Sequence, residues 1–406
     1  MNQLTRAPRA ILIDIIPPQL DKQTAERRLL ELDALTKTYG GIVVVKLFQK
    51  RSTPDYRTYI GSGKLNEIIQ LAAQEKAELL IINNLLKPKQ LFEIEEWIRK
   101  SSPKQNRSAL HVWDRVDLIL KIFDKHAKTA EAKLQIKLAA IRHMGPRIFG
   151  MGLELMQQTG GIGTRGVGET NTEIMRRHLA EQERQVKREL ERIAVSRANH
   201  RKHRDRIGLK TVSIIGYTNA GKSSLLNALT HKSAYVANVL FSTLDTRVDK
   251  LYIPHESSES ERVTSEWGPQ TRAVTSTHGV IPTTGPVHSQ KILLSDTIGF
   301  IQDLPPQLID AFRSTLDETI DADAVLQIVD ASDPYLPQKL EEVEKILHDL
   351  RVDEKPRLFV FNKIDALSKK DAVSLKKKFR HLKPQFVSAL TKQGIPELKK
   401  AIAKLI

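Results

Sequence analysis

The chain contains no cysteine and few aromatic residues, which make up only 5% of its 406 positions. The absence of cysteine excludes a disulfide scaffold and a cysteine-built metal site, and it fits the reducing conditions of the cytoplasm, where we expect the protein. No apolar run approaches the roughly 20 residues that cross a bilayer, so no membrane span is expected. Asp14 interrupts the apolar run at 11–16 and Pro17 follows it, a pattern that predicts a first strand and not a signal peptide.

Acidic residues are also in short supply: 48 Asp and Glu face 64 Lys and Arg, which leaves a net charge of +16. A surplus of this size favours a polyanionic partner, nucleic acid first, with a solvated basic surface as the plainer alternative. The length of the chain is enough for two or three domains of ordinary size.

The first 114 residues alternate between strand-like and helical stretches. Stretches rich in Ile, Val and Leu lie at 9–15, 41–48, 78–83 and 109–113, with helical patterns at 22–38, 64–76 and 89–101. This alternation predicts an N-terminal α/β domain, 1–114, whose sheet is largely parallel. Within it, residues 59–64 (YIGSGK) lead into a helix. A capped glycine turn is the favoured interpretation there, and an anion site at the helix N-terminus is the alternative.

Apolar residues at helical spacing predict two long helices in the next part of the chain, 115–207. The first seam consists of Leu120, Phe123, Ala127, Ala130, Leu134 and Ile141, and the second of Leu179, Val186, Leu190 and Ile193. Such spacing is typical of helices that pack together, so we expect an antiparallel coiled-coil arm. Its second helix is basic, since residues 174–206 include 11 Lys and Arg against five Asp and Glu. With few aromatic residues nearby, this charge favours phosphate contacts on folded RNA over single-strand stacking.

A glycine-rich segment, 160–170, lies between the two predicted helices. It reads GGIGTRGVGET and places five glycines within nine residues, too many for a continuing helix. We interpret it as a flexible tip whose backbone can approach a partner closely, and a merely mobile hairpin is the alternative. The tip residues of interest are Gly160, Gly161, Gly163, Thr164, Arg165, Gly166 and Gly168.

The last part of the chain, 208–406, opens with a phosphate-binding motif. Gly216-Tyr217-Thr218-Asn219-Ala220-Gly221-Lys222-Ser223 matches the pattern G-x-x-x-x-G-K-[ST], and with Ser224 it lies between a strand-like run and a helix. Glycines let backbone amides close around the β-phosphate, and the helix dipole adds to the field. Lys222 would supply a positive charge to the β/γ oxygens, and Ser223 would offer its hydroxyl to Mg²⁺.

The sequence DTIG at 296–299 follows a strand and predicts the Mg²⁺ and γ-phosphate side of the site. Asp296 can hold Mg²⁺ through water, and Gly299 can donate its backbone N–H to the γ-phosphate. A second metal-binding hydroxyl is expected between 232 and 249, near Phe241, where Thr243 is favoured and Thr246 is the alternative. The predicted catalytic residues are Lys222, Thr243 and Gly299, and the predicted Mg²⁺ ligands are Ser223, Thr243 and Asp296.

Base selection is assigned to the sequence Asn362-Lys363-Ile364-Asp365, which follows the strand predicted at 357–361. Asp365 can accept two hydrogen bonds that guanine supplies and adenine does not, while Asn362 ties the base site back to the phosphate loop. Ser388-Ala389 is a weaker match, where a backbone N–H meets guanine O6. Each motif ends a strand, as ligand sites in open α/β sheets do. We therefore predict a Ras-like domain that binds GTP and GDP and hydrolyses GTP.

Phe300 directly follows the DTIG motif, at the position where Ras-like enzymes carry a glutamine that orients the attacking water. A phenyl ring cannot orient water by hydrogen bonding, so we expect slow hydrolysis that a partner or a cation accelerates. Asn219 in the phosphate loop is a candidate ligand for a monovalent cation such as K⁺, and stabilisation of the turn is an equally weighted alternative.

The order of these parts resembles the HflX family of translational GTPases over nearly the whole chain. The matching stretches are 59–64, 121–150, 160–170, 216–229, 241–245, 295–305 and 362–365, of which 160–170 is the most specific. The resemblance implies an α/β N-terminal domain, a two-helix arm and a Ras-like GTPase domain. It also implies a protein that binds the 50S subunit and the 70S ribosome and, with GTP bound, splits stalled ribosomes. The glycine-rich tip would then contact 23S rRNA.

Two features depart from the family pattern. Residues 255–289 form a polar segment where the family usually has a tight hairpin, and we interpret it as a disordered or lineage-specific insertion. The chain also ends one predicted helix after Ser388-Ala389, whereas many bacterial members continue into a further domain.

Three functions fit these motifs: a factor that splits ribosomes, a GTP-dependent assembly factor for the large subunit, and an RNA-remodelling module with nucleotide as a structural switch. The first is favoured, and the motifs do not separate it from the second. We expect the protein to act as a monomer.

If Asn219 binds a monovalent cation, GTP turnover should be faster in KCl than in NaCl at equal ionic strength. The reason is that K⁺ would place positive charge beside the phosphates, where negative charge develops in the transition state. Steady-state GTP hydrolysis in the two salts measures the difference. Equal turnover would leave Asn219 with the turn-stabilising role alone.

Overall fold

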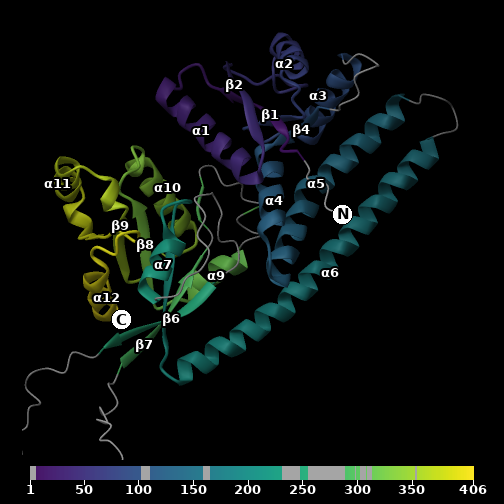
Figure 1. Ribbon diagram of the computed structural model, residues 1–406. Coiled ribbons are helices and arrows are strands. Elements are labelled where there is room, and N and C mark those ends of the chain that lie inside the picture. The colour runs from purple at the N-terminus through teal and green to yellow at the C-terminus, as the bar shows by residue number, and fades with distance from the viewer. Residues whose placement is uncertain are drawn as a thin grey trace, which may run out of the picture.

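The computed structural model describes residues 6–101, 110–158, 165–230, 247–254, 289–297, 299–301, 308, 313–352 and 354–406. Two α/β bodies lie side by side, and a pair of long helices runs diagonally past them (Figure 1). The first body precedes the helical pair in the chain and the second follows it.

A four-stranded parallel sheet forms the first body, as predicted. Its strands are β1 (Arg9–Ile16), β2 (Ile42–Lys50), β3 (Leu79–Ile82) and β4 (His111–Asp114), in the order β2-β1-β3-β4. The connecting helices are α1 (Lys22–Tyr39), α2 (Ser62–Glu75) and α3 (Pro88–Ser101). The two central strands, β1 and β3, are almost entirely buried, because helices cover both faces of a parallel sheet.

The first helical seam is divided between α4 (Arg115–His126) and α5 (Ala130–Gln158). α4 starts directly from β4, since Asp114 forms a reciprocal capping box with the first turn of the helix. Phe123 on α4 is buried in the core of the first body. The backbone becomes extended at Ala127, and only α5 continues into the helical pair. The prediction of one helix through the whole seam is therefore wrong. The break was not visible in the sequence, because the apolar residues of both helices follow the same spacing.

The helix α6 (Arg165–Arg206) is 42 residues long and lies antiparallel to α5 (Figure 1). It begins at Arg165, so Gly166 and Gly168 belong to its first turns and not to a loop, which corrects the prediction for that end of the glycine-rich segment. Each glycine costs a helix about 1 kcal/mol relative to alanine, and a helix of this length tolerates that cost near its start. The other tip residues, Gly160, Gly161, Gly163 and Thr164, lie outside the described residues.

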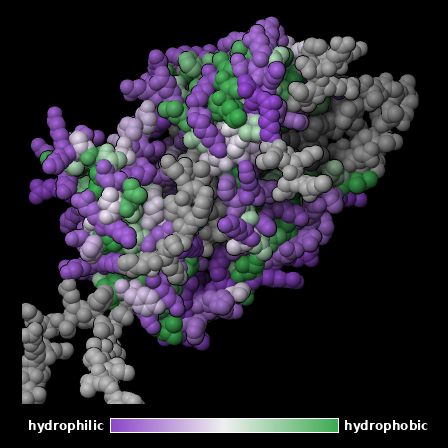
Figure 2. Space-filling view, viewed as in Figure 1, coloured by the Kyte–Doolittle hydropathy of each residue, from purple (hydrophilic) through white to green (hydrophobic). Residues whose placement is uncertain are grey.

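Apolar packing and ion pairs join α5 and α6. Val186, from the predicted second seam, is buried. Arg142 Nε on α5 lies 3.2 Å from Glu183 Oε1 on α6, and Arg197 on α6 pairs with Glu131 near the start of α5. The exposed side of α6 is mainly hydrophilic, with scattered apolar residues (Figure 2). Within the part of the chain that the structure describes, no helix is long and apolar enough to cross a membrane.

The second body contains a six-stranded sheet in the order β10-β9-β8-β5-β7-β6. Its strands are β5 (Lys210–Gly216), β6 (Arg247–Pro254), β7 (Ser289–Asp296), β8 (Ala324–Asp330), β9 (Arg357–Asn362) and β10 (Gln385–Phe386). Its described helices are α7 (Lys222–Thr230), α9 (Arg313–Asp321), α10 (Leu336–Asp349), α11 (Lys369–Lys378) and α12 (Ile395–Leu405). Among the strands that the structure describes here, only β6 is antiparallel to its neighbour, and the others are parallel.

The strands β6 and β7 pair from Arg247 with Asp296 to Pro254 with Ser289. Ser289 is therefore a strand residue, and the predicted insertion at 255–289 is one residue too long at its C-terminal end. Residues 255–288 lie outside the described part of the chain. The strand pairing brings the two ends of the insertion together at the end of the β-ladder furthest from Asp296.

One hydrophobic core passes from the first body into the second. Leu32 on α1 and Phe123 on α4 belong to the same cluster of buried residues as Ile215, Tyr217 and Phe300. All five are at most 8% exposed. The phosphate loop therefore borders the first body as well as its own sheet.

Candidate nucleotide-binding site

The phosphate loop connects β5 to α7 and passes very close to two neighbours. A Cβ on Gly216, whose φ is 149°, would lie 2.3 Å from the carbonyl oxygen of Ile328. A Cβ on Gly221, whose φ is 89°, would lie 2.2 Å from Nδ2 of Asn362. Neither distance is compatible with a side chain, so both positions require glycine. Asn219 has φ of 62°, the left-handed conformation expected at a tight turn.

Lys222, the first residue of α7, is buried inside this loop. Its Nζ donates hydrogen bonds to the carbonyl oxygens of Gly216 at 3.2 Å and Tyr217 at 3.0 Å. Burial lowers the pKa of this ammonium to about 8, although the negative charge of Asp296 acts to raise the pKa. A phosphate in the loop would favour the charged form, so the ammonium is placed where anion binding compensates its desolvation.

Two of the three predicted Mg²⁺ ligands lie next to each other. Ser223 Oγ donates a hydrogen bond of 2.6 Å to Oδ2 of Asp296, which is completely buried at the end of β7. A hydroxyl and a carboxylate form the oxygen-only donor set that Mg²⁺ prefers, so these residues fit the ion. The third predicted ligand, Thr243, lies outside the described residues, as do Phe241 and Thr246.

The residues predicted to bind guanine converge at the ends of β9 and β10. Asn362 Nδ2 donates to the carbonyl oxygen of Ala220 at 3.0 Å, and Asn362 Oδ1 accepts from the backbone N–H of Ala389 at 3.0 Å. Ser388 Oγ donates to Asp365 Oδ1 at 2.5 Å, which orients this carboxylate. The expected link from Asn362 to the phosphate loop is thus present in the structure.

Lys363 also lies in this region, in the left-handed conformation with φ of 65°. Its Nζ is 2.7 Å from Oδ2 of Asp330, at the end of β8. Asp330 was not among the predicted site residues, and its position beside the base-binding motif becomes evident only from the strand order.

Gly299 and Phe300 lie directly against the phosphate loop. The Phe300 N–H donates to the carbonyl oxygen of Gly216 at 3.1 Å, and the Thr218 N–H donates to the carbonyl oxygen of Phe300 at 2.7 Å. A Cβ on Gly299 would lie 2.9 Å from Lys222 Nζ, so glycine is needed for this approach. The Phe300 side chain is 2% exposed and belongs to the core.

The sequence gives no sign of the most distant contact of the loop. The Tyr217 hydroxyl donates a hydrogen bond of 2.6 Å to Oε2 of Glu31 on α1, 186 positions away in the chain. Lys339 Nζ lies 4.7 Å from the centroid of the Tyr217 ring, on the α10 side. The pKa of Tyr217 is raised, first by burial and then by the negative charge of Glu31, so the phenol stays protonated and acts as the donor.

The three predicted RNA-contacting residues that the structure describes do not lie at this site. Arg165, Gly166 and Gly168 lie at the start of α6, at the end of the helical pair furthest from the second body (Figure 1). The structure therefore places the start of α6, with these three residues, far from the nucleotide residues.

A phosphate loop, an adjoining Ser–Asp pair and a base site with an oriented aspartate together define a P-loop GTPase. Three family models match successive parts of this chain. Residues 26–124 match "GTP-binding GTPase N-terminal", 126–204 match "GTP-binding GTPase Middle Region" and 211–363 match "50S ribosome-binding GTPase".

Similar proteins cover most of the chain. GTPase HflX of Caldanaerobacter subterraneus subsp. tengcongensis is 37% identical over 368 residues, 90% of this chain and 75% of that one. GTPase HflX of Escherichia coli K12 is 32% identical over 397 residues, 97% of this chain and 82% of that one. A crystal structure of a GTP-binding protein from Sulfolobus solfataricus in complex with GDP is 25% identical, with a TM-score of 0.46, over 98% of both chains. The chain belongs to the HflX family of GTPases, and it binds and hydrolyses GTP.

Replacement of Asp365 by Asn should weaken GTP binding and favour xanthosine triphosphate. The amide can donate a hydrogen bond to the xanthine oxygen that replaces the guanine amino group. The loss for GTP should be about 1–3 kcal/mol, roughly 5- to 150-fold in Kd. Competition of each nucleotide against a fluorescent GDP analogue measures both affinities. Undiminished GTP binding by the variant would mean that another group selects the base.

Proposed function

We propose that this chain is a ribosome-dependent GTPase that splits stalled or idle 70S ribosomes into subunits. The observation that carries the proposal is the direct connection between the basic helix and the phosphate loop. α6 ends at Arg206, β5 begins at Lys210, and β5 ends at Gly216, the first residue of the loop. A partner held by α6 is thus linked to the nucleotide through one short turn and one strand.

The charge of α6 supports a polyanionic partner. Some of its basic residues are neutralised within the helix, as in the pairs that Glu181 forms with Arg184 and Arg188. Four exposed basic side chains form no ion pair with any residue that the structure describes: Arg176, Arg192, Lys202 and Arg206. Unpaired surface charge of this kind binds phosphates by releasing their counterions. The match to a model described as "50S ribosome-binding GTPase" supports the ribosome as that partner.

A second connection joins the arm to the nucleotide site. Arg201 on α6 forms an ion pair with Asp321, the last residue of α9. α9 follows the DTIG motif in the chain, and in GTPases this region responds to the γ-phosphate. The ion pair would therefore transmit a change at the γ-phosphate to the base of the arm.

Hydrolysis would proceed by in-line attack of water on the γ-phosphate, with charge stabilised by Lys222, Ser223 and Thr243. Mg²⁺ held by Ser223, Asp296 and Thr243 would neutralise charge on the β/γ oxygens, and K⁺ at Asn219 is a further candidate. GTP would hold the conformation that binds ribosomes, and hydrolysis would release the factor.

The glycine-rich segment, Gly160 to Gly168 with Arg165, would contact 23S rRNA at the far end of the arm. The start of α6, a basic helix, supports this proposal because it lies far from the nucleotide site. The protein would act in the cytoplasm, where ribosomes are, and as a monomer.

Incubation of the protein and GTP with 70S ribosomes should yield free 30S and 50S subunits in a sucrose gradient. Under this proposal GTP holds the arm in its binding conformation and GDP does not, so incubation with GDP should yield few free subunits. If 70S ribosomes stay intact and the protein binds only precursor particles, it is a large-subunit assembly factor instead.

The Lys222→Ala variant is the matched control for this experiment. It removes the charge that the phosphates require, so it should bind no GTP and split no ribosomes. An unchanged effect of this variant on ribosomes or RNA would instead favour an RNA-remodelling module whose effect requires no GTP hydrolysis and no bound γ-phosphate.

Replacement of Arg176, Arg192 and Lys202 by Gln should weaken binding to the 50S subunit. Each neutralised phosphate contact should lower the slope of log affinity against log salt concentration by roughly 1. Sedimentation binding at several KCl concentrations measures this slope.

The same charge change at three exposed lysines of the second body, Lys370, Lys377 and Lys404, provides the control. Both triple variants should hydrolyse GTP at the same rate without ribosomes. If the control weakens 50S binding as much as the α6 variant does, the effect is one of net charge and not of the arm.

A further inference from the structure

Tyr217, in the phosphate loop, contacts side chains of both bodies. Its hydroxyl donates to Glu31 of the first body, and its ring lies beneath Lys339 of the second. Its carbonyl oxygen accepts the hydrogen bond from Lys222 Nζ and a second one, of 3.3 Å, from the N–H of Ala220. A movement of the Tyr217 side chain would therefore displace a carbonyl that positions the phosphate-binding lysine.

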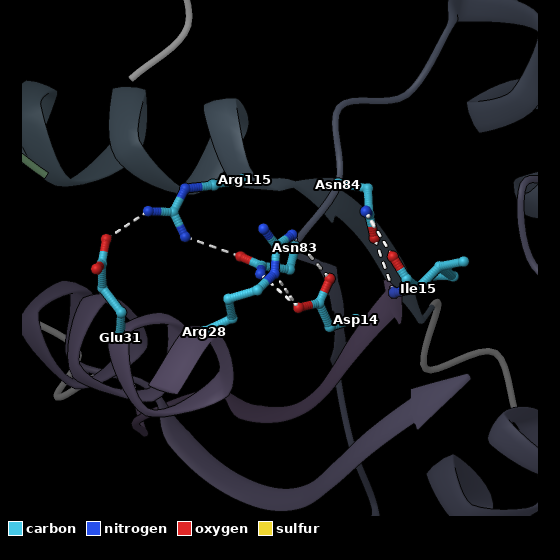
Figure 3. Close-up of polar contacts among 7 residues, drawn as sticks. All are labelled: Asp14, Ile15, Arg28, Glu31, Asn83, Asn84 and Arg115. Carbon is cyan, nitrogen blue, oxygen red and sulfur yellow. Dashed lines mark hydrogen bonds and ion pairs between the residues drawn. The ribbon is translucent and has the colours of Figure 1, made fainter. Parts of the chain in front are cut away.

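Glu31 is held in place from the opposite side by Arg115, the first residue of α4. Nη2 of Arg115 pairs with Glu31 Oε1, and Nη1 donates to Asn83 Oδ1 at 2.8 Å (Figure 3). The Glu31 side chain is 10% exposed and that of Arg115 is 7% exposed. A carboxylate with so little contact with water depends on its protein partners, so its position is closely defined.

The network extends from Arg115 to the carboxyl ends of the central strands of the first sheet. Asn83 Nδ2 donates to Oδ2 of the fully buried Asp14 at 3.0 Å, and Arg28 donates to the same carboxylate at 2.7 Å (Figure 3). Beside it, Asn84 exchanges two hydrogen bonds with the backbone of Ile15. Side chains from α1, α4, β1 and the end of β3 therefore form one connected structure that ends on the phosphate loop.

We propose that the N-terminal body sets the nucleotide affinity of the GTPase through the Glu31–Tyr217 hydrogen bond. In this assignment Glu31 is a positioning residue: it touches no nucleotide, and it holds Tyr217 so that the phosphate loop keeps its binding conformation. Preorganisation of a binding loop raises affinity because less conformational freedom is lost on binding. By thermodynamic reciprocity, bound nucleotide strengthens the docking of the N-terminal body to the same extent.

The test compares the unmodified chain with the variants Tyr217→Phe, Glu31→Gln and the double variant. Tyr217→Phe removes the hydroxyl and leaves Glu31 paired with Arg115. Stopped-flow dissociation of a fluorescent GDP analogue and its equilibrium Kd are the readouts, with no ribosomes present. The outcome is therefore independent of the proposed ribosomal function. Tyr252→Phe, the same change on an exposed residue of β6, is the control.

Each single variant should bind GDP about three- to tenfold more weakly, mainly through faster dissociation, as loss of a hydrogen bond to a carboxylate that positions the loop implies. The double variant should bind GDP no more weakly than Tyr217→Phe does, because the two changes remove the same hydrogen bond. Tyr252→Phe should bind as the unmodified protein does. Affinities within twofold of the unmodified protein for both single variants, or fully additive losses in the double variant, would overturn the proposal.

Steady-state GTP hydrolysis separates positioning from loss of folded protein. A displaced loop should raise KM by more than it lowers kcat, whereas a partly unfolded preparation lowers the apparent kcat at unchanged KM. The second pattern in both single variants would assign the contact a structural role only. Circular dichroism melting checks the fold, and if Tyr217→Phe does not fold, Glu31→Gln alone decides the result.

Discussion

Gly216 and Gly221 let the phosphate loop pass within contact distance of Ile328 and Asn362, and the arrangement of the nucleotide site depends on that close approach. The loop carbonyls that accept from Lys222, and the Ala220 carbonyl that accepts from Asn362, are all on this tightly held backbone. The β7 end, which carries Asp296, and the β9 end, which carries Asn362, are placed on either side of the loop by the strand order. Small residues here permit a dense set of polar contacts that larger ones would exclude.

The loop is also held from outside its own domain, because Tyr217 and Phe300 belong to the core that α1 and α4 share with β5. Interfaces between domains of one chain are commonly polar and permit relative motion. Here both apolar burial and a network of charged hydrogen bonds join the first body to the phosphate loop. A conformational change at the phosphates therefore meets resistance from the first body as well as from the second, which gives the N-terminal body a physical means to affect nucleotide binding.

The motifs of the nucleotide site could be placed from sequence because each is contiguous and ends a strand, as the loop at 216–223 and the base motif at 362–365 do. The parallel N-terminal sheet could also be predicted, from its alternating pattern. Long-range pairing could not be, since nothing near Tyr217 or Glu31 indicates a partner 186 positions away. The break at Ala127 and the helical start at Arg165 escaped prediction for a different reason: apolar spacing and glycine content describe a helix, whereas capping and packing decide where it begins and ends.

The length of α6 has a mechanical consequence. At 1.5 Å per residue, a helix of 42 residues extends for about 63 Å. Its base is joined to the phosphate-loop strand by a turn of three residues, 207–209. A helix of this length converts a rotation of about 5° at its C-terminal end into a displacement of roughly 5 Å at its N-terminal end, about the pitch of one helical turn. Adjustments at the nucleotide that are too small to alter either body internally are thus large enough to move the start of α6 by several ångströms.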